Sequence, residues 1–492
     1  MKKFDIIVIG SGAGLMVTEA AIMKGMKCAI IEKSKFGGTC LTKGCIPSKM
    51  LVYPADLIRE SEKSERVGVC FNKPRIDWDK ISKRLWNQID HNIHMEEGLK
   101  KVENLDVYNG TAEFTGKDTL RIKLADGSYS EEIQSELIVI AVGARSFIPP
   151  IKDLEQTGYV TSETFFGEKY PKKPWKSLVI VGGGAIGAEI AHIFSSLGTK
   201  VTIVERRPRL IATEEEEISA MVQHEFMHNG ITVLTNHNAL SAGCKGRLKT
   251  LTVEDAVTGE RKVIEAEEIF ISSGVRTNTD ILHIEHTDVE TDAKGWIKTN
   301  EYMETSQKGI YAIGDINGIY QFRHKANYEA EVLINNLFTT GEKRRAHYKA
   351  VPWAIFTNPQ VAHVGLTQAE AKSKGLRCWI GRNYYSQIAG GIALGIEDDS
   401  IDNGFIKIIV GENRNILGAH IVGPHASILI HSFIYLMEFD LTCDKRRLEK
   451  SEHLICPQLS SFTTINESMV IHPSLNELTA WVLDNIDWSK EG

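Results

Sequence analysis

DIIVIGSGAG, at residues 5–14, is the stretch that decides the fold of this chain. Its β-branched residues predict a buried strand, and its glycines predict a tight turn after that strand. The next residues, 15–27, carry apolar side chains at helical spacing, and a second apolar run, CAIIE, ends on Glu32. A strand, a helix and a second strand in this order predict a βαβ unit with parallel strands.

The same pattern occurs a second time in the chain. SLVIVGGGAIG, at residues 177–187, is followed by a helix-like stretch and then by VTIVE, which ends on Glu205. A glycine-rich turn between a strand and a helix presents free N–H groups to which a pyrophosphate can bind. Two such units predict two dinucleotide ligands, and the duplication is more informative than either unit alone.

Length and composition set the broad class of the protein. The chain has 492 residues, of which 42% are hydrophobic and 25% charged, and its formal net charge is −7. This balance is ordinary for a globular protein of about three domains, and it gives no reason to expect nucleic acid or a membrane as partner. No run approaches the ~18 apolar residues of a membrane span, and Gly10 ends the N-terminal apolar run too early for a signal peptide. We therefore expect a cytoplasmic protein.

The first glycine turn has the features of a dinucleotide site. Gly10 permits the sharp turn from strand to helix, and Gly12 lets the backbone approach a pyrophosphate. Glu32 can accept hydrogen bonds from ribose hydroxyls. Leu15 stands where the third glycine of the motif would serve close packing of helix on strand, which weakens the match. We expect Gly10, Gly12, Gly14 and Glu32 to contact the first dinucleotide.

The second turn has all three motif glycines, Gly182, Gly184 and Gly187, and we expect them to contact the second dinucleotide. Glu205 favours NAD, because a carboxylate at this place pairs with the 2′-hydroxyl of NAD and repels the 2′-phosphate of NADP. Arg206 and Arg207 follow it directly, and arginine is the residue that NADP sites use. NADP therefore stays an alternative.

The stretch GGTCLTKGCIPSK, at residues 37–49, carries Cys40 and Cys45. Such a pair could bind zinc, but zinc would need two more ligands, which usually come from another close pair. The other cysteines offer no such pair: Cys28, Cys70, Cys244, Cys378, Cys443 and Cys456. We therefore expect no metal. A disulfide across a helix turn is possible at this spacing, and beside a flavin it could accept electrons and then exchange with a substrate disulfide.

The pattern GGTC-x4-GCIPSK resembles the active-site signature of the flavoprotein pyridine nucleotide–disulfide oxidoreductases. This family includes dihydrolipoamide dehydrogenase, glutathione reductase and mycothione reductase. The resemblance implies that Cys40 and Cys45 form a redox-active disulfide, in which Cys40 exchanges with substrate and Cys45 contacts the flavin. It also implies that Lys49 lies near the flavin and pairs with Glu189.

The C-terminal stretch IHPSLNE, at residues 471–477, resembles the His-Pro-x-x-x-Glu motif of the same family. Pro473 suits the first position of a helix, and Glu477 could then reach back to orient the imidazole of His472. The histidine would take a proton from a substrate thiol or return one to a leaving thiol. In this family both residues serve the partner subunit's site, so the resemblance implies a homodimer with shared active sites.

Further matches to the family extend along the chain. They imply additional cofactor contacts from Thr39, Gly110, Val142, Gly143, Ala144, Gly274, Gly314, Asp315 and His324. Asp315 would bind the ribityl chain of the flavin. The cofactors implied are FAD and NAD, with NADP as the alternative.

Together these features predict an α/β fold with two Rossmann-like domains and a C-terminal α+β domain. We expect the FAD-binding domain at residues 1–148 and 275–347, because GIYAIGD at 309–315 reads as a returning strand. The NAD(P)-binding domain would be inserted at 149–274, and residues 348–492 would form the dimerisation or interface domain.

The expected function is electron transfer between NAD(H) and a dithiol or disulfide, as in dihydrolipoyl dehydrogenase, which Glu205 and residues 46–49 fit. The alternative is an NAD(P)H-dependent reductase of a low-molecular-weight disulfide, of the mycothione or glutathione reductase type. Residues 49–53 and 471–475 fit mycothione reductase. The substrate would be a small dithiol or disulfide, or a lipoyl group.

Residues 441–471 depart from the family pattern, because they form a connection roughly twice the usual length. A long loop beside a site often controls access or specificity. We hypothesise that this insertion narrows or changes the disulfide that the protein accepts. The alternative is a surface elaboration at the edge of the dimer.

Overall fold

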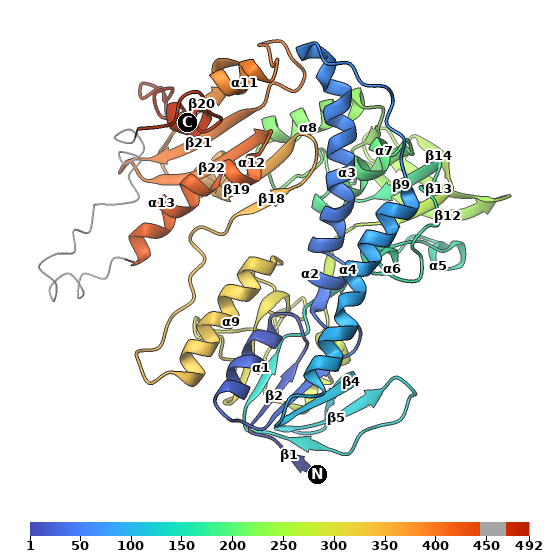
Figure 1. Cartoon of the computed structure of the whole chain (residues 1–492), viewed down its shortest axis with the longest axis vertical. Coiled ribbons are helices and arrows are strands. Elements are labelled where there is room, and N and C mark those ends of the chain that lie inside the picture. The colour runs from blue at the N-terminus through green and yellow to red at the C-terminus, as the bar shows by residue number, and fades with distance from the viewer. Residues whose placement is uncertain (443–468, 492) are drawn as a thin grey trace, which may run out of the picture.

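The computed structural model describes residues 1–442 and 469–491 of the chain. Within them the strands form five sheets. Figure 1 places the N-terminal sheet at one end of the molecule and the C-terminal sheet towards the other. Two long helices, α3 (Cys45–Lys63) and α4 (Trp78–Leu99), run lengthwise and connect these regions (Figure 1).

The first sheet has eight strands in the order β1-β6-β5-β4-β3-β2-β7-β17. They are β1 (Lys2–Lys3), β2 (Ile6–Ile9), β3 (Cys28–Glu32), β4 (Leu105–Phe114), β5 (Thr119–Leu124), β6 (Ile133–Gln134), β7 (Ile138–Ile140) and β17 (Ile310–Ala312). β2 pairs in parallel with β3 and β7, and β17 pairs in parallel with β7. Every residue of β2 and β3 is buried, which is why these runs are almost purely apolar.

Two helices far apart in the sequence lie side by side on this sheet. α1 (Gly14–Met23) follows β2 as the βαβ pattern predicts, and α9 (Arg323–Phe338) follows β17 through the short turn η4 (Gly314–Asn317). α1 and α9 pack against each other (Figure 1). The glycine turn after β2 and the turn after β17 are therefore brought to the same end of the sheet.

The middle of the chain forms a second parallel sheet, of the kind found in nucleotide-binding domains. Its four parallel strands have the order β11-β10-β9-β15. They are β9 (Ser177–Val181), β10 (Lys200–Val204), β11 (Thr232–Leu234) and β15 (Glu268–Ile271), with helices α7 (Ala185–Ser196) and α8 (Glu216–His228). A separate antiparallel sheet contains β12 (His237–Lys245), β13 (Leu248–Asp255) and β14 (Arg261–Ala266).

This middle region is joined to the first sheet by a two-stranded ribbon. β8 (Ala144–Ser146) and β16 (Val275–Thr277) pair in an antiparallel manner where the chain leaves the first sheet and where it returns. Short helices flank the ribbon: α5 (Leu154–Thr157), α6 (Ser162–Phe165), η2 (Thr279–Ile281) and η3 (Ile284–His286). The middle region is thus an insertion with both connections at one place.

The C-terminal region is built on an antiparallel sheet of five strands in the order β18-β19-β22-β21-β20. They are β18 (Trp353–Ile355), β19 (Gln360–Gly365), β20 (Cys378–Tyr384), β21 (Phe405–Gly411) and β22 (Ile416–Gly423). Its helices are α10 (Gln368–Ser373), α11 (Ala389–Ala393), α12 (Ala426–Leu429), α13 (His431–Thr442) and α16 (Glu477–Trp481), with the short η5 (Tyr385–Gln387).

Helix α3 ties the regions together. It begins at the second cysteine of the pair, continues into η1 (Ser64–Val67), and packs along α7 of the middle region. Asp56 accepts a hydrogen bond from the buried His192 at 2.8 Å, and Arg59 donates to Ser195 at 3.0 Å. Within the described residues no helix combines the length and the apolar character that crossing a membrane requires.

Candidate active site

A long cavity in the first domain connects the glycine turn after β2 with the cysteine pair. Twelve of the residues expected at the site line it: Gly10, Gly12, Glu32, Thr39, Cys40, Cys45, Gly110, Val142, Gly143, Ala144, Gly314 and Asp315. They come from the turns after β2, β7 and β17, from the strands β3, β4 and β8, from α2 (Gly38–Thr42) and from the start of α3. The parallel strands of one sheet bring their carboxyl ends, and hence these residues, to one edge.

The first glycine turn is sterically closed to larger residues. Gly10 has a φ of 102°, and a Cβ there would lie 2.3 Å from the carbonyl oxygen of Ala141. A Cβ on Gly14 would lie 2.7 Å from Cγ1 of Val8, so this glycine allows α1 to approach β2 closely. Leu15 occupies the third position of the motif, as the sequence indicates, and Gly14 permits the close approach of helix to strand one position earlier.

Glu32 is held at the end of β3 by hydrogen bonds to both of its oxygens. Its Oε2 accepts from the backbone N–H of Ser11 at 3.0 Å and from the Ser11 hydroxyl at 2.7 Å. Its Oε1 accepts from the N–H of Ser34 at 2.9 Å. A carboxylate offers about four acceptor positions, so this carboxylate can still accept from ribose hydroxyls in the cavity.

Asp315 faces the other part of the same cavity. Within residues 1–442 and 469–491, no donor forms a hydrogen bond with its carboxylate, and burial raises the pKa of Asp315 to about 6. Behind it, Glu329 accepts from the N–H of Gly314 at 2.7 Å, and Lys325 donates to the Gly314 carbonyl at 3.0 Å. These two hydrogen bonds hold the turn in place, while the Asp315 carboxylate itself has no donor. A ligand with hydroxyl groups, such as the ribityl chain of FAD, would provide the missing donors.

Cys40 lies in α2, and Cys45 is the first residue of α3. Both are free thiols, and they are hydrogen-bonded to each other. The hydrogen bond from Cys45 is the main cause that lowers the pKa of Cys40 to about 7, against the effect of burial, and Arg323 and Lys49 lower it further by their charge. The same hydrogen bond and burial raise the pKa of Cys45. Near neutral pH the pair therefore shares one proton, and one sulfur can be a thiolate.

Lys49 lies one helical turn beyond Cys45, outside the lining of the cavity. Its Nζ is 2.9 Å from Oε1 and 2.7 Å from Oε2 of Glu189, which lies on α7. The N–H of Phe356 donates to the same Oε1 at 3.0 Å, and the Lys49 ammonium lies 4.4 Å from the centre of the Phe356 ring. This pair connects the cysteine helix with the middle region.

The glycines of the second turn differ in the space around them. A Cβ on Gly182 would lie 2.5 Å from the Ser272 carbonyl oxygen, and one on Gly187 would lie 2.0 Å from the Gly182 carbonyl oxygen. Gly184, the residue before α7, has open space where a Cβ would point, and so does Gly274. The first two glycines are required by packing, whereas Gly184 leaves room for a ligand at the start of α7.

Glu205 lies beside this loop. Its carboxylate accepts from the N–H of Gly183 at 2.6 Å and from the N–H of Arg207 at 2.7 Å. The carboxylate is thereby fixed at the end of β10, where a ribose bound against the loop would meet it.

His472 lies in the C-terminal region and does not line the cavity of its own chain. Its Nδ1 is hydrogen-bonded to Glu477, whose side chain is 1% exposed, whereas the side chain of His472 is 70% exposed. The prediction that Pro473 begins a helix was wrong: the peptide bond before it is cis, and α16 begins at Glu477. The orienting contact nevertheless forms, because the intervening turn returns the histidine to the helix start.

Several charged residues of the cavity were not found by sequence reasoning. Lys43 and Glu163 line it, and Nζ of Lys43 lies 3.4 Å from Oε2 of Glu163. Oε1 of Glu163 also accepts a hydrogen bond from the N–H of Ser146 at 2.9 Å. Arg323 lines the cavity, whereas the neighbouring His324 turns away to the carbonyl oxygen of Pro352 at 2.8 Å. We had expected a cofactor contact from His324, but the side chain of this turn that lines the cavity is that of Arg323.

The insertion that we expected to control substrate access, residues 441–471, lies almost wholly outside the described residues, together with Cys443 and Cys456.

Comparison with known proteins identifies the family of this chain. Residues 4–330 match the model of the family "Pyridine nucleotide-disulphide oxidoreductase", and residues 351–466 match the dimerisation domain of that family. Mycothione reductase of Mycobacterium tuberculosis (strain H37Rv) is 34% identical over 475 residues, covering 93% of this chain and 97% of the relative. Dihydrolipoyl dehydrogenase of Bacillus subtilis (strain 168) is 31% identical over 438 residues, covering 87% and 90%.

Among solved structures, the HOCl-induced flavoprotein disulfide reductase RclA from Escherichia coli has a TM-score of 0.78 and 25% identity, covering 98% of this chain and 99% of its own. The predicted α/β class with two Rossmann-like sheets and a C-terminal dimerisation domain is confirmed. The family uses FAD and NAD(P)H. The chain therefore belongs to the pyridine nucleotide–disulphide oxidoreductases and is an FAD-dependent disulfide oxidoreductase.

Proposed function

We propose that this protein transfers electrons between NAD(H) and a small dithiol or a lipoyl group, as dihydrolipoyl dehydrogenase does. The observation that carries the choice of NAD is the fixed carboxylate of Glu205 beside the second glycine loop. A carboxylate at this position accepts from the 2′-hydroxyl of NAD and repels the 2′-phosphate of NADP. The arginines at 206 and 207 are exposed, which suits solvated charges.

The first cavity would hold FAD, with Glu32 at the adenosine ribose, the backbone at Gly10 and Gly12 near the pyrophosphate, and Asp315 at the ribityl chain. FAD would supply the transfer of an electron pair between the nicotinamide and the cysteine pair. Lys49, held by Glu189, would place a positive charge beside the flavin-binding end of the cavity.

Cys40 is the residue that we assign to exchange with substrate. Its lowered pKa, about 7, provides a thiolate near neutral pH. In the direction of disulfide reduction, this thiolate attacks one sulfur of the substrate, forms a mixed disulfide and releases the other sulfur as a thiol. Attack of the Cys45 sulfur on Cys40 then re-forms the internal disulfide and releases the second substrate thiol. Dithiol oxidation is the reverse of these steps, and reduction potentials and concentrations set the direction.

His472 and Glu477 would act in the site of a second subunit. The imidazole is exposed and is oriented by a buried carboxylate, as expected of a general base whose substrate comes from outside its own domain. The match of residues 351–466 to a dimerisation domain supports a homodimer. The proposal can be tested by mixing inactive subunits. Co-expressed Cys40→Ser and His472→Ala chains should regain activity, because mixed dimers contain one intact site, whereas each variant alone should remain inactive.

The first test of the substrate assignment is an anaerobic titration of the flavoprotein with NADH and, separately, with NADPH. It should be followed by turnover assays with dihydrolipoamide, lipoamide and mycothione disulfide. NADH should reduce the flavin much faster than NADPH, and dihydrolipoamide should reduce NAD. Rapid reduction by NADH without any lipoamide turnover would contradict the lipoyl assignment while preserving the redox centre.

A second candidate is an NADH-dependent reductase of a low-molecular-weight disulfide. It is favoured by the similarity to mycothione reductase, which at 34% identity extends over 93% of this chain. Reduction of mycothione disulfide by NADH, without oxidation of dihydrolipoamide, would establish this candidate instead.

A further inference from the structure

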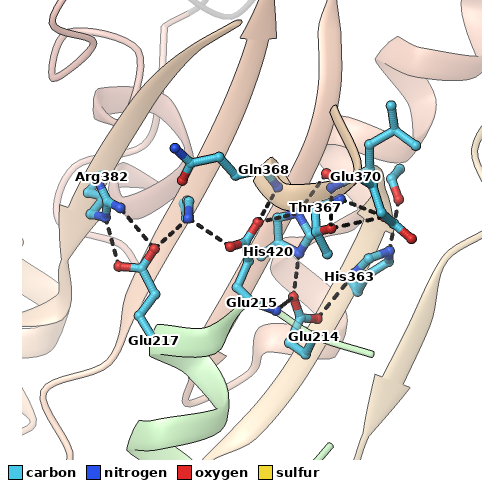
Figure 2. Close-up of polar contacts among 12 residues, drawn as sticks. Glu214, Glu215, Glu217, His363, Thr367, Gln368, Glu370, Arg382 and His420 are labelled. Carbon is cyan, nitrogen blue, oxygen red and sulfur yellow. Dashed lines mark hydrogen bonds and ion pairs between the residues drawn. The ribbon is translucent and has the colours of Figure 1, made fainter. Parts of the chain in front are cut away.

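A cluster of buried charged residues lies where the middle region meets the C-terminal sheet, and none of its members lines the cavity that holds the cysteines. Glu214 and Glu215 come just before α8, and His363 and His420 come from β19 and β22 (Figure 2). The two histidines are directly opposite each other in the strand pairing, and their ring centres lie 4.6 Å apart. Both rings therefore face Glu214 from one face of the sheet.

The outer nitrogen of each ring has a defined partner. Nε2 of His363 lies 2.9 Å from the carbonyl oxygen of Gly365, and Nε2 of His420 lies 3.0 Å from that of Leu366. A carbonyl oxygen only accepts, so each Nε2 must carry a proton and donate it. In a neutral imidazole, the proton on Nε2 leaves a lone pair on Nδ1.

Both Nδ1 atoms point at the same carboxylate. Nδ1 of His363 lies 3.1 Å from Oε2 of Glu214, and Nδ1 of His420 lies 2.5 Å from Oε1 (Figure 2). An ionised carboxylate is also only an acceptor. Three lone-pair groups thus converge, and all three residues are buried, with exposed fractions of 1% for Glu214, 7% for His363 and 0% for His420. Such an arrangement is stable only with positive charge between the groups.

The neighbouring cations are already used by other carboxylates. Nζ of Lys407 lies 2.8 Å from Oε2 of Glu215 and 2.6 Å from Oε1 of Glu217. Arg382 makes two hydrogen bonds to Glu217, at 2.9 and 2.8 Å (Figure 2). Within the described residues, the ion pairs of Glu214 are formed with the two histidines alone. In the described part of the chain, the Glu214 carboxylate therefore pairs with no lysine or arginine, and the nearby Arg209 guanidinium donates to the backbone carbonyl oxygen of Glu214 instead, at 3.4 Å.

The three ligand atoms lie within 4.8 Å of one another. Two imidazole nitrogens and one carboxylate oxygen form a ligand set that zinc takes in proteins, with a fourth position for water or for the second carboxylate oxygen. Metal-binding histidines usually donate their other ring N–H to a carbonyl or carboxylate, which orients the ring, and both histidines here do so. Our expectation of no metal considered only the cysteines and did not examine this set.

We propose that Glu214, His363 and His420 bind one divalent transition-metal ion, best matched by Zn²⁺, between the middle region and the C-terminal sheet. Binding replaces any proton on the two Nδ1 atoms and releases it to solvent. The ligands come from two regions that are distant in sequence, so the ion would fix the NAD-binding region to the dimerisation domain. The role is structural, and it is independent of the substrate proposed above.

The test measures metal directly in the full-length flavoprotein. The background carries Cys40→Ser and Cys45→Ser, so that thiolates of the active site cannot bind the ion. After incubation with ZnCl₂ and extensive dialysis, we expect about one zinc per chain by mass spectrometry. His420→Gln and Glu214→Gln should lose this zinc. His431→Gln, which changes an exposed histidine of the C-terminal region, should keep it.

A crystal grown with ZnCl₂ provides a readout that does not depend on variants that could misfold. An anomalous difference peak at the zinc edge, between the two Nδ1 atoms and Glu214, would support the proposal. Absence of that peak would overturn the proposal. So would a zinc content of the Cys40→Ser, Cys45→Ser protein no higher than that of the same protein with His420→Gln. Protons on the histidines, rather than a metal ion, would then balance the charge of Glu214. Neither measurement uses disulfide turnover, so failure here would not bear on the proposed catalytic function.

Discussion

The ammonium of Lys49 lies within 2.9 Å of both carboxylate oxygens of Glu189, so an ion pair joins the cysteine helix α3 to α7 of the inserted region. The carboxylate is 12% exposed and is also held by the N–H of Phe356. The cysteine helix and the inserted region are therefore joined by this ion pair, in addition to the Asp56–His192 and Arg59–Ser195 contacts.

Replacing Glu189 by glutamine should slow the transfer of electrons from NADH to the flavin by about tenfold, equivalent to about 1.4 kcal/mol in the barrier. The reason is that Lys49 loses the charge that fixes its position, while the shape of the side chain is kept. Stopped-flow measurement of flavin bleaching by NADH would show this. Glu168→Gln, at an exposed carboxylate of the same region, is the matched control and should be unaffected. An unchanged bleaching rate in Glu189→Gln would show that the pair is only structural.

The reactivity of the reduced cysteines should follow a pKa near 7. Because the pKa of Cys40 is lowered to about 7, the thiolate fraction, and with it the rate of alkylation by iodoacetamide, should rise as pH increases through that value. An ordinary thiol would show the same rise at about 8.5. Cys45→Ala removes the hydrogen bond and should move the midpoint upward, whereas Cys45→Ser keeps a donor and should move it less. Identical midpoints in both variants would argue against the hydrogen bond as the cause.

Asp315→Asn should have opposite effects on FAD binding and on the stability of the flavin-free protein. The folded pKa of about 6 is above the unfolded value, so the contribution of Asp315 to stability is complete below pH ~4 and is lost as pH rises through about 6. Above that pH the asparagine variant without flavin should be more stable by on the order of 2 kcal/mol. Its affinity for FAD should fall about tenfold, because a hydrogen bond to a charged acceptor is weakened.

Two measurements check this prediction. Thermal unfolding of the flavin-free protein should show the difference in stability above pH ~6 and its disappearance below pH ~4. Release of FAD, followed by its fluorescence on dilution, reports the affinity. If the variant were equally stable at all pH values, the carboxylate would not be desolvated as described.

The glycines of the second loop should divide into two kinds. Gly187→Ala places a Cβ 2.0 Å from the Gly182 carbonyl oxygen, so it should destabilise the protein by a few kcal/mol, on the scale of about 1–3 kcal/mol for overpacking. Gly184→Ala meets no atom within 4 Å, so it should fold normally but bind NADH more weakly, because the methyl group occupies the approach of the pyrophosphate. Chemical denaturation and NADH titration separate the two effects. Normal NADH affinity in Gly184→Ala would place the pyrophosphate elsewhere.

The sequence predicted the parts of the site that depend on local spacing. The turn at Gly10, the end of β3 at Glu32 and the turn at Asp315 each follow from a strand that ends in a characteristic residue, and a parallel sheet brings such ends to one edge. The packing role of Gly14 was not predicted, because the fingerprint was applied at a fixed spacing and Gly14 was expected only as a dinucleotide contact. The actual requirement is the 2.7 Å approach of its Cβ position to Val8.

Contacts between distant segments could not be predicted in this way. Lys43 and Glu163 meet across the cavity although they are 120 positions apart, and no local pattern marks either of them. The same holds for Arg323, which faces the cysteines only because α9 packs beside α1. The cis peptide bond before Pro473 also depends on tertiary context, since a local rule favours proline as the start of a helix.

The pairing of β17 with β7 has a consequence for the synthesis of this protein on the ribosome. β7 emerges early, but its neighbour β17 follows only after the whole inserted region has been made. The inserted region is continuous in sequence and can complete its sheet while the first domain still exposes an unpaired strand edge. The flavin site cannot form until Asp315 has left the ribosome. A nascent chain that stalls before that point would therefore be a folded NAD-binding body attached to an unfinished, aggregation-prone sheet.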